Sequence, residues 1–166
     1  VYGIWGFSLE QEIGVTRKGA GELIKTYLDT YPGVKKYMED IKQTGREQGY
    51  VSTLFGRRRA LPELKSKNFN MRSFGERVAM NTPIQGTAAD IIKIAMVRVR
   101  DRLLRDGLQS RLILQVHDEL ILEAPKDEQE TAMRLPPEEM ENAFTMAAPL
   151  VAEATAGHSW HAAQQI

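Results

Sequence analysis

Cysteine is absent from the 166 residues, and no run of apolar residues is long enough to span a membrane. The first absence excludes disulfide bonds and cysteine-ligated metal sites, and it agrees with a reducing compartment. The second absence predicts that a membrane is not among the partners. Histidine occurs only three times, which disfavours a metal site built from several imidazoles.

A net charge of one sign is also lacking, because 22 Lys and Arg balance 22 Asp and Glu. This balance conceals an asymmetry: residues 1–114 contain 20 basic and 12 acidic side chains, whereas residues 115–166 contain 2 and 10. Such asymmetry indicates a basic surface for an anionic partner in the first part. A solvated acidic helix accounts for the second part. The length fits one domain with a sizeable core.

A compact polar group interrupts the apolar runs Leu112–Val116 and Leu120–Leu122. Runs this short and rich in branched residues predict two strands, joined by a tight turn near His117 and Asp118. The side-chain period of two in a strand directs Asp118 and Glu119 to opposite faces. Asp118 is then placed to hold a metal, with Glu119 in support. A plain polar turn would explain the same residues.

Helical patterns account for much of the remaining chain. They predict a helix over residues 7–13, one that Thr16 caps, one that begins at Pro32 and runs toward Gly49, one over residues 68–81 and one over residues 84–104 that Gly107 ends.

Prolines predict where some of these helices break. Thr82 and Pro83 should end one helix and start the next, as cap and first residue. After the hairpin, the prolines in Leu135–Pro137 should divide a helix that begins at Lys126, because an interior proline costs about 3 kcal/mol. A last strand is predicted over Leu150–Ala154, and Trp160 is expected to cover the edge of the core.

Three adjacent arginines follow the strand-like segment Tyr50–Phe55 and Gly56. Arg57, Arg58 and Arg59 cannot share one face of a strand or helix, so we expect a loop with diverging guanidinium groups. Guanidinium geometry suits phosphate oxygens, which favours a phosphate-contacting loop. A solvated basic turn paired with carboxylates is the alternative.

Small residues form a low face on the helix that follows Pro83, namely Gly86, Ala88 and Ala89. Close packing against another helix or a sheet is the plainest explanation of such a face. The neighbouring Gln85 favours a second one, because an amide beside a bare face can reach a base edge in a minor groove.

The segment Gln115–Leu120 resembles the third polymerase motif of the family A DNA polymerases, the bacterial DNA polymerase I group. Residues 77–90 and residues 50–59 resemble the same family, in the order in which the family has them. Three long matches in the right order are far more specific than any one alone. The resemblance is close from Val1 to about Lys126 and is looser beyond.

This resemblance implies an α+β fold, in which helices pack on a small antiparallel sheet and a β-hairpin carries the catalytic acid. It implies a segment of a template-directed DNA polymerase that adds deoxynucleotides to a primer 3′ end with two Mg²⁺ ions. The partners would be primer–template DNA, deoxynucleoside triphosphates and the remainder of the polymerase chain, in the bacterial cytoplasm at the nucleoid. Residues 1–80 would be a fingers-like part with the basic loop, and residues 81–166 a palm part.

The resemblance also implies residue roles. Asp118 matches one of two metal-binding aspartates of the palm, and Glu119 is the adjacent catalytic acid with a supporting role. His117 resembles the residue that touches the primer end. The positions that match DNA-contacting residues are Tyr2, near the templating base, and Arg77, Asn81 and Gln85, along the duplex.

The family's other palm aspartate and its triphosphate-binding helical turns are not in the sequence. We therefore expect a piece of a longer polymerase that is inactive in isolation, since a two-metal site needs ligands from both sides. Two other functions stay open from the residues alone. One is a duplex-binding module without catalysis, and the other, less favoured, is a metal-dependent phosphohydrolase that uses His117 and Asp118.

Overall fold

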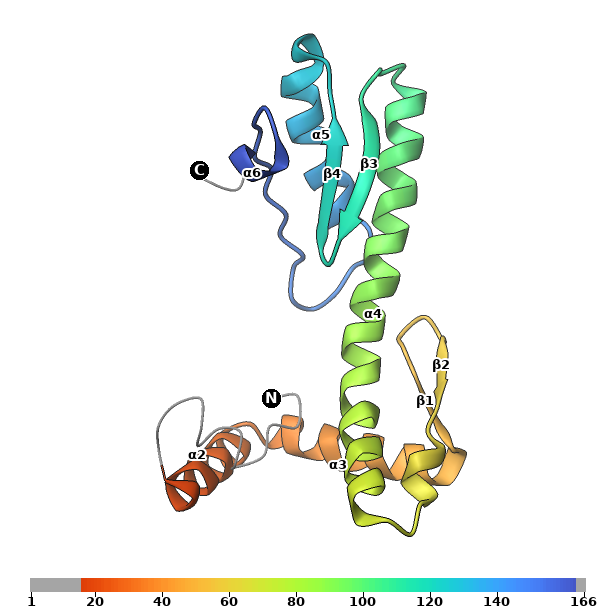
Figure 1. Ribbon diagram of the computed structural model, residues 1–166, viewed down its shortest axis with the longest axis vertical. Helices are drawn as coiled ribbons and strands as arrows, with labels where there is room; N and C mark the ends of the chain where they lie inside the picture. The colour runs from red at the N-terminus through yellow and green to blue at the C-terminus, as the bar shows by residue number, and fades with distance from the viewer. Residues whose placement is uncertain (1–15, 164–166) are drawn as a thin grey trace. The chain divides into compact units, whose positions relative to one another are not determined.

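The computed structural model describes residues 16–163 (Figure 1). Helices and two separate two-stranded antiparallel sheets confirm the expected α+β class. The chain forms two compact units, of which the first ends at Thr87 and the second begins at Ala88. Helix α4, Phe69–Arg105, contributes residues to both units. The helix expected over residues 7–13 lies outside the described residues.

The first two described helices begin and end where local signals predict. In α2 (Arg17–Thr30) the Thr16 hydroxyl accepts a hydrogen bond from the Gly19 N–H at 3.2 Å, which confirms the cap. Helix α3 (Pro32–Gln48) has proline at its first position, where no N–H is needed. It ends at Gly49, whose φ of 78° is the left-handed conformation that glycine adopts without steric cost.

The core of the first unit lies where α3, a short hairpin and α4 meet. Strands β1 (Tyr50–Ser52) and β2 (Arg58–Ala60) pair antiparallel and are followed by the 3₁₀ helix η1 (Pro62–Lys65). The buried members of the core are Val51, Leu61, Leu64 and Ala79, with Ile41 and Val78 packed against them.

Helix α4 is continuous through Pro83, so the predicted break at Thr82 and Pro83 is wrong. Proline removes the N–H that would bond to the Ala79 carbonyl, at a cost of about 3 kcal/mol in a helix interior. Ala79 and Met80 are buried directly before this point, and the Tyr37 hydroxyl donates to the Met80 carbonyl at 3.3 Å. Packing and this hydrogen bond oppose the local preference and keep the helix continuous.

The second unit packs the end of α4 and a further helix against one hairpin. Strands β3 (Arg111–Val116) and β4 (Glu119–Glu123) pair antiparallel, which confirms the predicted hairpin. The 3₁₀ helix η2 (Lys126–Glu128) leads into α5 (Gln129–Glu141). The buried core members are Val99, Leu103 and Leu135, with Leu108, Leu120 and Leu122 packed against them.

The prolines in α5 do not break it, contrary to prediction: Pro136 and Pro137 both lie inside the helix. Leu135 and Pro136 are buried, and their packing offsets the two lost backbone hydrogen bonds.

Two expectations for the carboxyl-terminal part are also wrong. Leu150–Ala154 is not a strand. The Ala152 N–H bonds to the Glu141 carboxylate at 3.0 Å instead of a neighbouring strand. Trp160 begins the short helix α6 (Trp160–Ala163) and stays 44% exposed, so it does not cover the core. Within residues 16–163, no helix has both the length and the apolar character needed to cross a membrane.

Pro137→Ala should stabilise the protein by about 1–3 kcal/mol, because alanine restores a donor for the Met133 carbonyl inside a continuous helix. Pro32→Ala is the matched control, since its N–H would have no helical partner and little change is expected. The midpoint of urea denaturation, followed by circular dichroism, measures both effects. A lower midpoint for Pro137→Ala would contradict an unbroken α5.

Candidate active-site hairpin and duplex-binding helix face

The turn between β3 and β4 contains only His117 and Asp118, because Val116 and Glu119 form the last strand pair. His117 has a φ of 51°, in the left-handed region that two-residue hairpin turns fill with glycine or asparagine. The Gln115 side-chain amide donates to the His117 carbonyl and braces this conformation. A non-glycine residue held in such a conformation is a frequent property of functional sites.

The two acidic residues at the turn differ in their contacts. Asp118 is exposed, and across the described part of the chain its carboxylate makes no hydrogen bond or ion pair. Glu119 is exposed as the first residue of β4, and its carboxylate accepts the Trp160 indole N–H at 3.3 Å. Asp118 is therefore the carboxylate available to an external ligand.

The turn offers some, but not all, of the ligands that a divalent cation needs. Exposed carboxylate oxygens are the ligands that Mg²⁺ prefers. Across residues 16–163, however, no group of three or more His, Cys, Asp or Glu side chains is arranged to hold a metal ion. The oxygen donors of the turn would need further ligands from elsewhere to hold a metal ion.

The hairpin is anchored where β3 begins. The Glu128 carboxylate accepts the Gln109 N–H and the Ser110 N–H, each at 2.8 Å, and the Ser110 hydroxyl at 2.6 Å. These hydrogen bonds lower the pKa of Glu128 from its ordinary value, and the one from the Gln109 backbone N–H has the largest effect. A charged Glu128 thus fixes the chain immediately before the strand that leads to the turn.

The positions on α4 that are predicted to contact DNA are four residues apart, and the continuity of the helix aligns them. Arg77 and Gln85 are exposed, and Asn81 is partly buried between them. Residues at this spacing lie on one helix face. The unbroken α4 thus brings these three side chains into one row.

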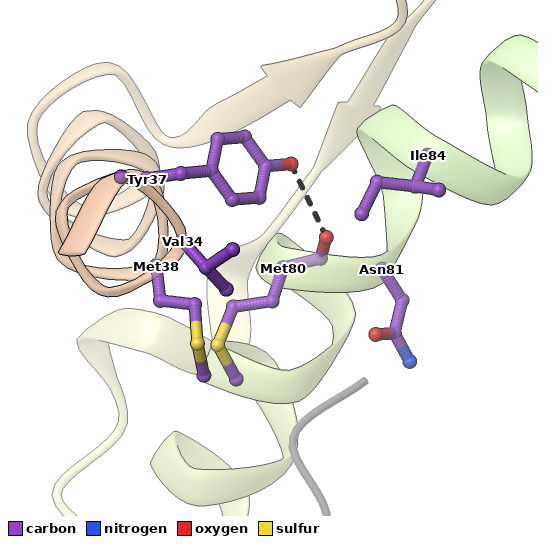
Figure 2. A pocket seen from close by; sticks show the side chains of 7 residues that line it. Val34, Tyr37, Met38, Met80, Asn81 and Ile84 are labelled. Carbon is purple, nitrogen blue, oxygen red and sulfur yellow. Dashed lines mark hydrogen bonds between the residues drawn. The ribbon is translucent and has the colours of Figure 1, made fainter. Parts of the chain in front are cut away.

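An apolar cavity of about 250 Å³ adjoins this row, and sequence reasoning missed it. Val34, Tyr37 and Met38 of α3 face Met80, Asn81 and Ile84 of α4 around it, and Gly33 completes the lining (Figure 2). The Asn81 side-chain oxygen is buried and has no hydrogen-bond partner among the described residues. The helical spacing of Val34, Tyr37 and Met38, which places them on one face of α3, is the signal that the sequence offers for this lining.

The arginine segment is not the loop that the sequence predicted. Arg58 and Arg59 lie in β2, opposite Ser52 and Val51, because pairing with β1 extends the strand into the basic run. The Arg58 guanidinium lies 4.6 Å from the centre of the Tyr50 ring, a cation–π contact. Arg57 remains in the turn, where its guanidinium donates to the Gly86 carbonyl at 2.8 Å. Tyr2 lies outside the described residues.

A family model described as DNA polymerase family A matches residues 1–162. The chain belongs to DNA polymerase family A. It is 55% identical to the DNA polymerase I of Bacillus caldotenax and 54% identical to that of Bacillus subtilis (strain 168), each over 164 residues. These alignments cover 99% of this chain and 19% of each relative, so the chain spans about a fifth of their length.

A solved structure agrees with the family A assignment. The chain is similar to the structure described as "POL domain of Pol1 from M. smegmatis complex with DNA primer-template and dNTP", with a TM-score of 0.92 and 42% identity. The similarity covers 99% of this chain and 29% of that one. The arrangement described above is therefore that of a family A polymerase segment, whereas the roles of its individual side chains stay predictions.

Glu128→Gln should destabilise this family A segment at neutral pH, because an amide replaces the charged acceptor at the start of β3. The folded-state pKa of Glu128 is lowered, so its stabilising contribution is present above the ordinary value of 4.5 and is lost as pH falls below it through the folded-state pKa. The gap between the unfolding midpoints of wild type and variant should shrink below pH 4.5. Glu130→Gln, an exposed neighbour, should show no such gap; an equal gap for both variants would refute this anchoring role.

Proposed function

We propose that the longer protein containing this chain is a template-directed DNA polymerase that extends a primer 3′ end with deoxynucleotides. The observation that carries the proposal is the exposed Asp118 in a strained two-residue turn of a family A polymerase chain. The similarity to the M. smegmatis polymerase domain, whose structure is a complex with primer-template DNA and dNTP, supports it. In this proposal residues 1–80 belong to a fingers part and residues 81–166 to a palm part, in an enzyme that acts at the bacterial nucleoid.

Asp118 would hold Mg²⁺ through its carboxylate, with Glu119 in a supporting position. Two such ions, when bound, supply charge stabilisation to the oxygens that enter and leave phosphorus. The braced conformation of the turn keeps the Asp118 carboxylate in one place, which lowers the entropy lost when a ligand binds. His117, in the same turn, would contact the primer end.

The row on α4 would hold the duplex. Arg77 supplies a charge for phosphate oxygens, and Gln85 supplies an amide for acceptors on base edges in the minor groove. Asn81 lies between them on the same helix face and would contact the duplex through its amide nitrogen, because its side-chain oxygen is buried. Arg58 and Arg59 add phosphate contacts from β2, and Tyr2 would lie near the templating base.

A second candidate function is duplex binding without catalysis, for the isolated 166-residue chain. It is favoured by the incomplete donor set among the described residues. Two close divalent cations repel each other strongly unless several carboxylates offset their charge. Under the leading proposal, the missing carboxylates come from the remainder of the polymerase.

Asp118→Asn in the complete polymerase should lower the rate of primer extension by at least about a thousandfold, because a metal's charge stabilisation is worth several kcal/mol. The affinity for primer–template should change by less than about threefold. Asp127→Asn, an exposed acid on η2, is the matched control and should extend normally. Extension by Asp118→Asn at the wild-type rate, or by the isolated chain alone, would overturn the assignment.

Arg77→Ala and Gln85→Ala should both weaken duplex binding, but with different salt dependence. Losing Arg77 should reduce the slope of log affinity against log salt by about 0.9, as expected for one phosphate contact. Losing Gln85 should weaken binding by about 1 kcal/mol and leave the slope unchanged. Titration of a labelled primer–template at several salt concentrations measures both, with Arg134→Ala on α5 as control. Equal slopes for Arg77→Ala and wild type would argue against phosphate contact.

A further inference from the structure

We propose that the β1–β2 turn, residues 53–57, is a clamp that positions Gln85 on α4, and that Arg57 acts in it as a positioning residue. The inference rests on the proposed function, because it concerns how the amide of Gln85 is held toward the minor groove. Neither the family resemblance of residues 50–59 nor the row of Arg77, Asn81 and Gln85 indicates this role for the turn.

Two hydrogen bonds tie the turn to consecutive residues of α4. The Leu54 N–H donates to the Thr87 hydroxyl oxygen at 3.0 Å, and that hydroxyl donates to the Pro83 carbonyl at 2.5 Å. The Arg57 guanidinium donates to the Gly86 carbonyl at 2.8 Å. The contacted residues Gly86 and Thr87 directly follow Gln85, so the clamp acts next to the residue it would position.

The turn itself is held in one conformation. The Thr53 N–H donates to the Arg57 carbonyl and the Gly56 N–H to the Thr53 carbonyl, both at 3.0 Å. The Thr53 hydroxyl also accepts the Arg57 N–H at 3.2 Å, and Gly56 takes a left-handed φ of 81°. Thr53 is only 5% exposed, so this closed turn can transmit a fixed position to α4.

The turn approaches the helix so closely that only glycine fits at position 86. A Cβ at Gly86 would lie 2.6 Å from the Thr53 methyl carbon and 3.5 Å from the Arg57 guanidinium. Glycine inside a helix is less favourable than alanine. Close approach of the turn gives a physical reason for glycine at this position, which packing within α4 alone does not.

The clamp lies where α4 lacks a backbone hydrogen bond. Pro83 cannot donate to the Ala79 carbonyl, which weakens the helix within one turn of Gln85. Gln85 is exposed, and no hydrogen bond from its side chain occurs among residues 16–163. Its direction therefore depends on the backbone beneath it, and the turn supplies contacts to that backbone on the side of Gly86.

The test uses the complete polymerase and a probe for the minor-groove contact. 3-Deazaadenine lacks the N3 acceptor that adenine presents in the minor groove. Four primers each carry 3-deazaadenine in place of adenine at one of the last four positions. Extension from each is compared with extension from the primer with natural adenine. Wild type should lose about tenfold in kcat/KM at the contacted position, and Gln85→Ala should show no difference between the two bases.

The clamp predicts a specific rescue. Gly86→Ala should reduce the tenfold discrimination to about twofold, because the new methyl group displaces the turn. Adding Thr53→Ser to Gly86→Ala removes the clashing methyl group but keeps the hydroxyl, and should restore discrimination to near the wild-type value. Arg57→Met should also reduce discrimination. Gly21→Ala, at a helix position with nothing within 4 Å, is the control and should leave it unchanged.

Each outcome separates the clamp from the proposed function. Wild-type discrimination in Gly86→Ala, or a loss that Thr53→Ser does not restore, overturns the clamp. Absence of discrimination in wild type overturns the minor-groove role of Gln85 itself. Circular dichroism of each variant shows whether it is folded, and the rescue by a second substitution excludes a general loss of structure as the cause.

Discussion

The continuity of helix α4 through Pro83 is the constraint that aligns Arg77, Asn81 and Gln85 on one helix face. Ala79 belongs to the first core, and Val99 and Leu103 belong to the second. Each fully buried Val or Leu side chain contributes roughly 1.5–3 kcal/mol, so the burial of Val51 and Leu61 in the first core offsets the cost of an interior proline. Under the proposed function this continuity matters for DNA binding, because a break at Pro83 would turn Gln85 away from the face of Arg77.

The two proposed functional elements are held in different ways. On α4, burial and hydrogen bonds from neighbouring segments hold the backbone, and exposed side chains project from it. At the hairpin tip the backbone of His117 is itself in an unfavourable conformation, which costs of order 1–3 kcal/mol. Strand pairing and the Gln115 side chain compensate for this cost. In both cases the position of the side chain follows from contacts made by other residues.

Local signals in the sequence predicted the caps and the hairpin well, because their causes are local. Thr16, Pro32 and Gly49 act through the backbone of adjacent residues, and the apolar runs around His117 need only each other as partners. The helix breaks predicted at Pro83 and Pro136 are wrong, because buried contacts from distant residues outweigh the local preference of proline. The loop predicted for Arg58 and Arg59 is wrong for a similar reason, since pairing with β1 decides their conformation. Motifs in the sequence identify the candidate site residues. The proposed clamp on Gly86 and the cavity beside Asn81 could not be predicted, because they depend on tertiary contacts.

The acidic surplus after residue 115 raises the question of how a polymerase segment with this charge would tolerate DNA. Many of these acids are engaged within the second unit. Glu139 pairs with Arg102 at 3.1 Å and Glu138 with Arg134 at 2.8 Å, while Glu128 and Glu141 accept backbone N–H groups. Pairing and hydrogen bonding reduce the repulsion that these carboxylates exert on phosphates. Asp118 has no such partner within residues 16–163. Under the proposed function, DNA phosphates would lie near this exposed carboxylate, and a bound cation would offset the repulsion between them. This electrostatic requirement supports the proposal of a divalent metal at the turn.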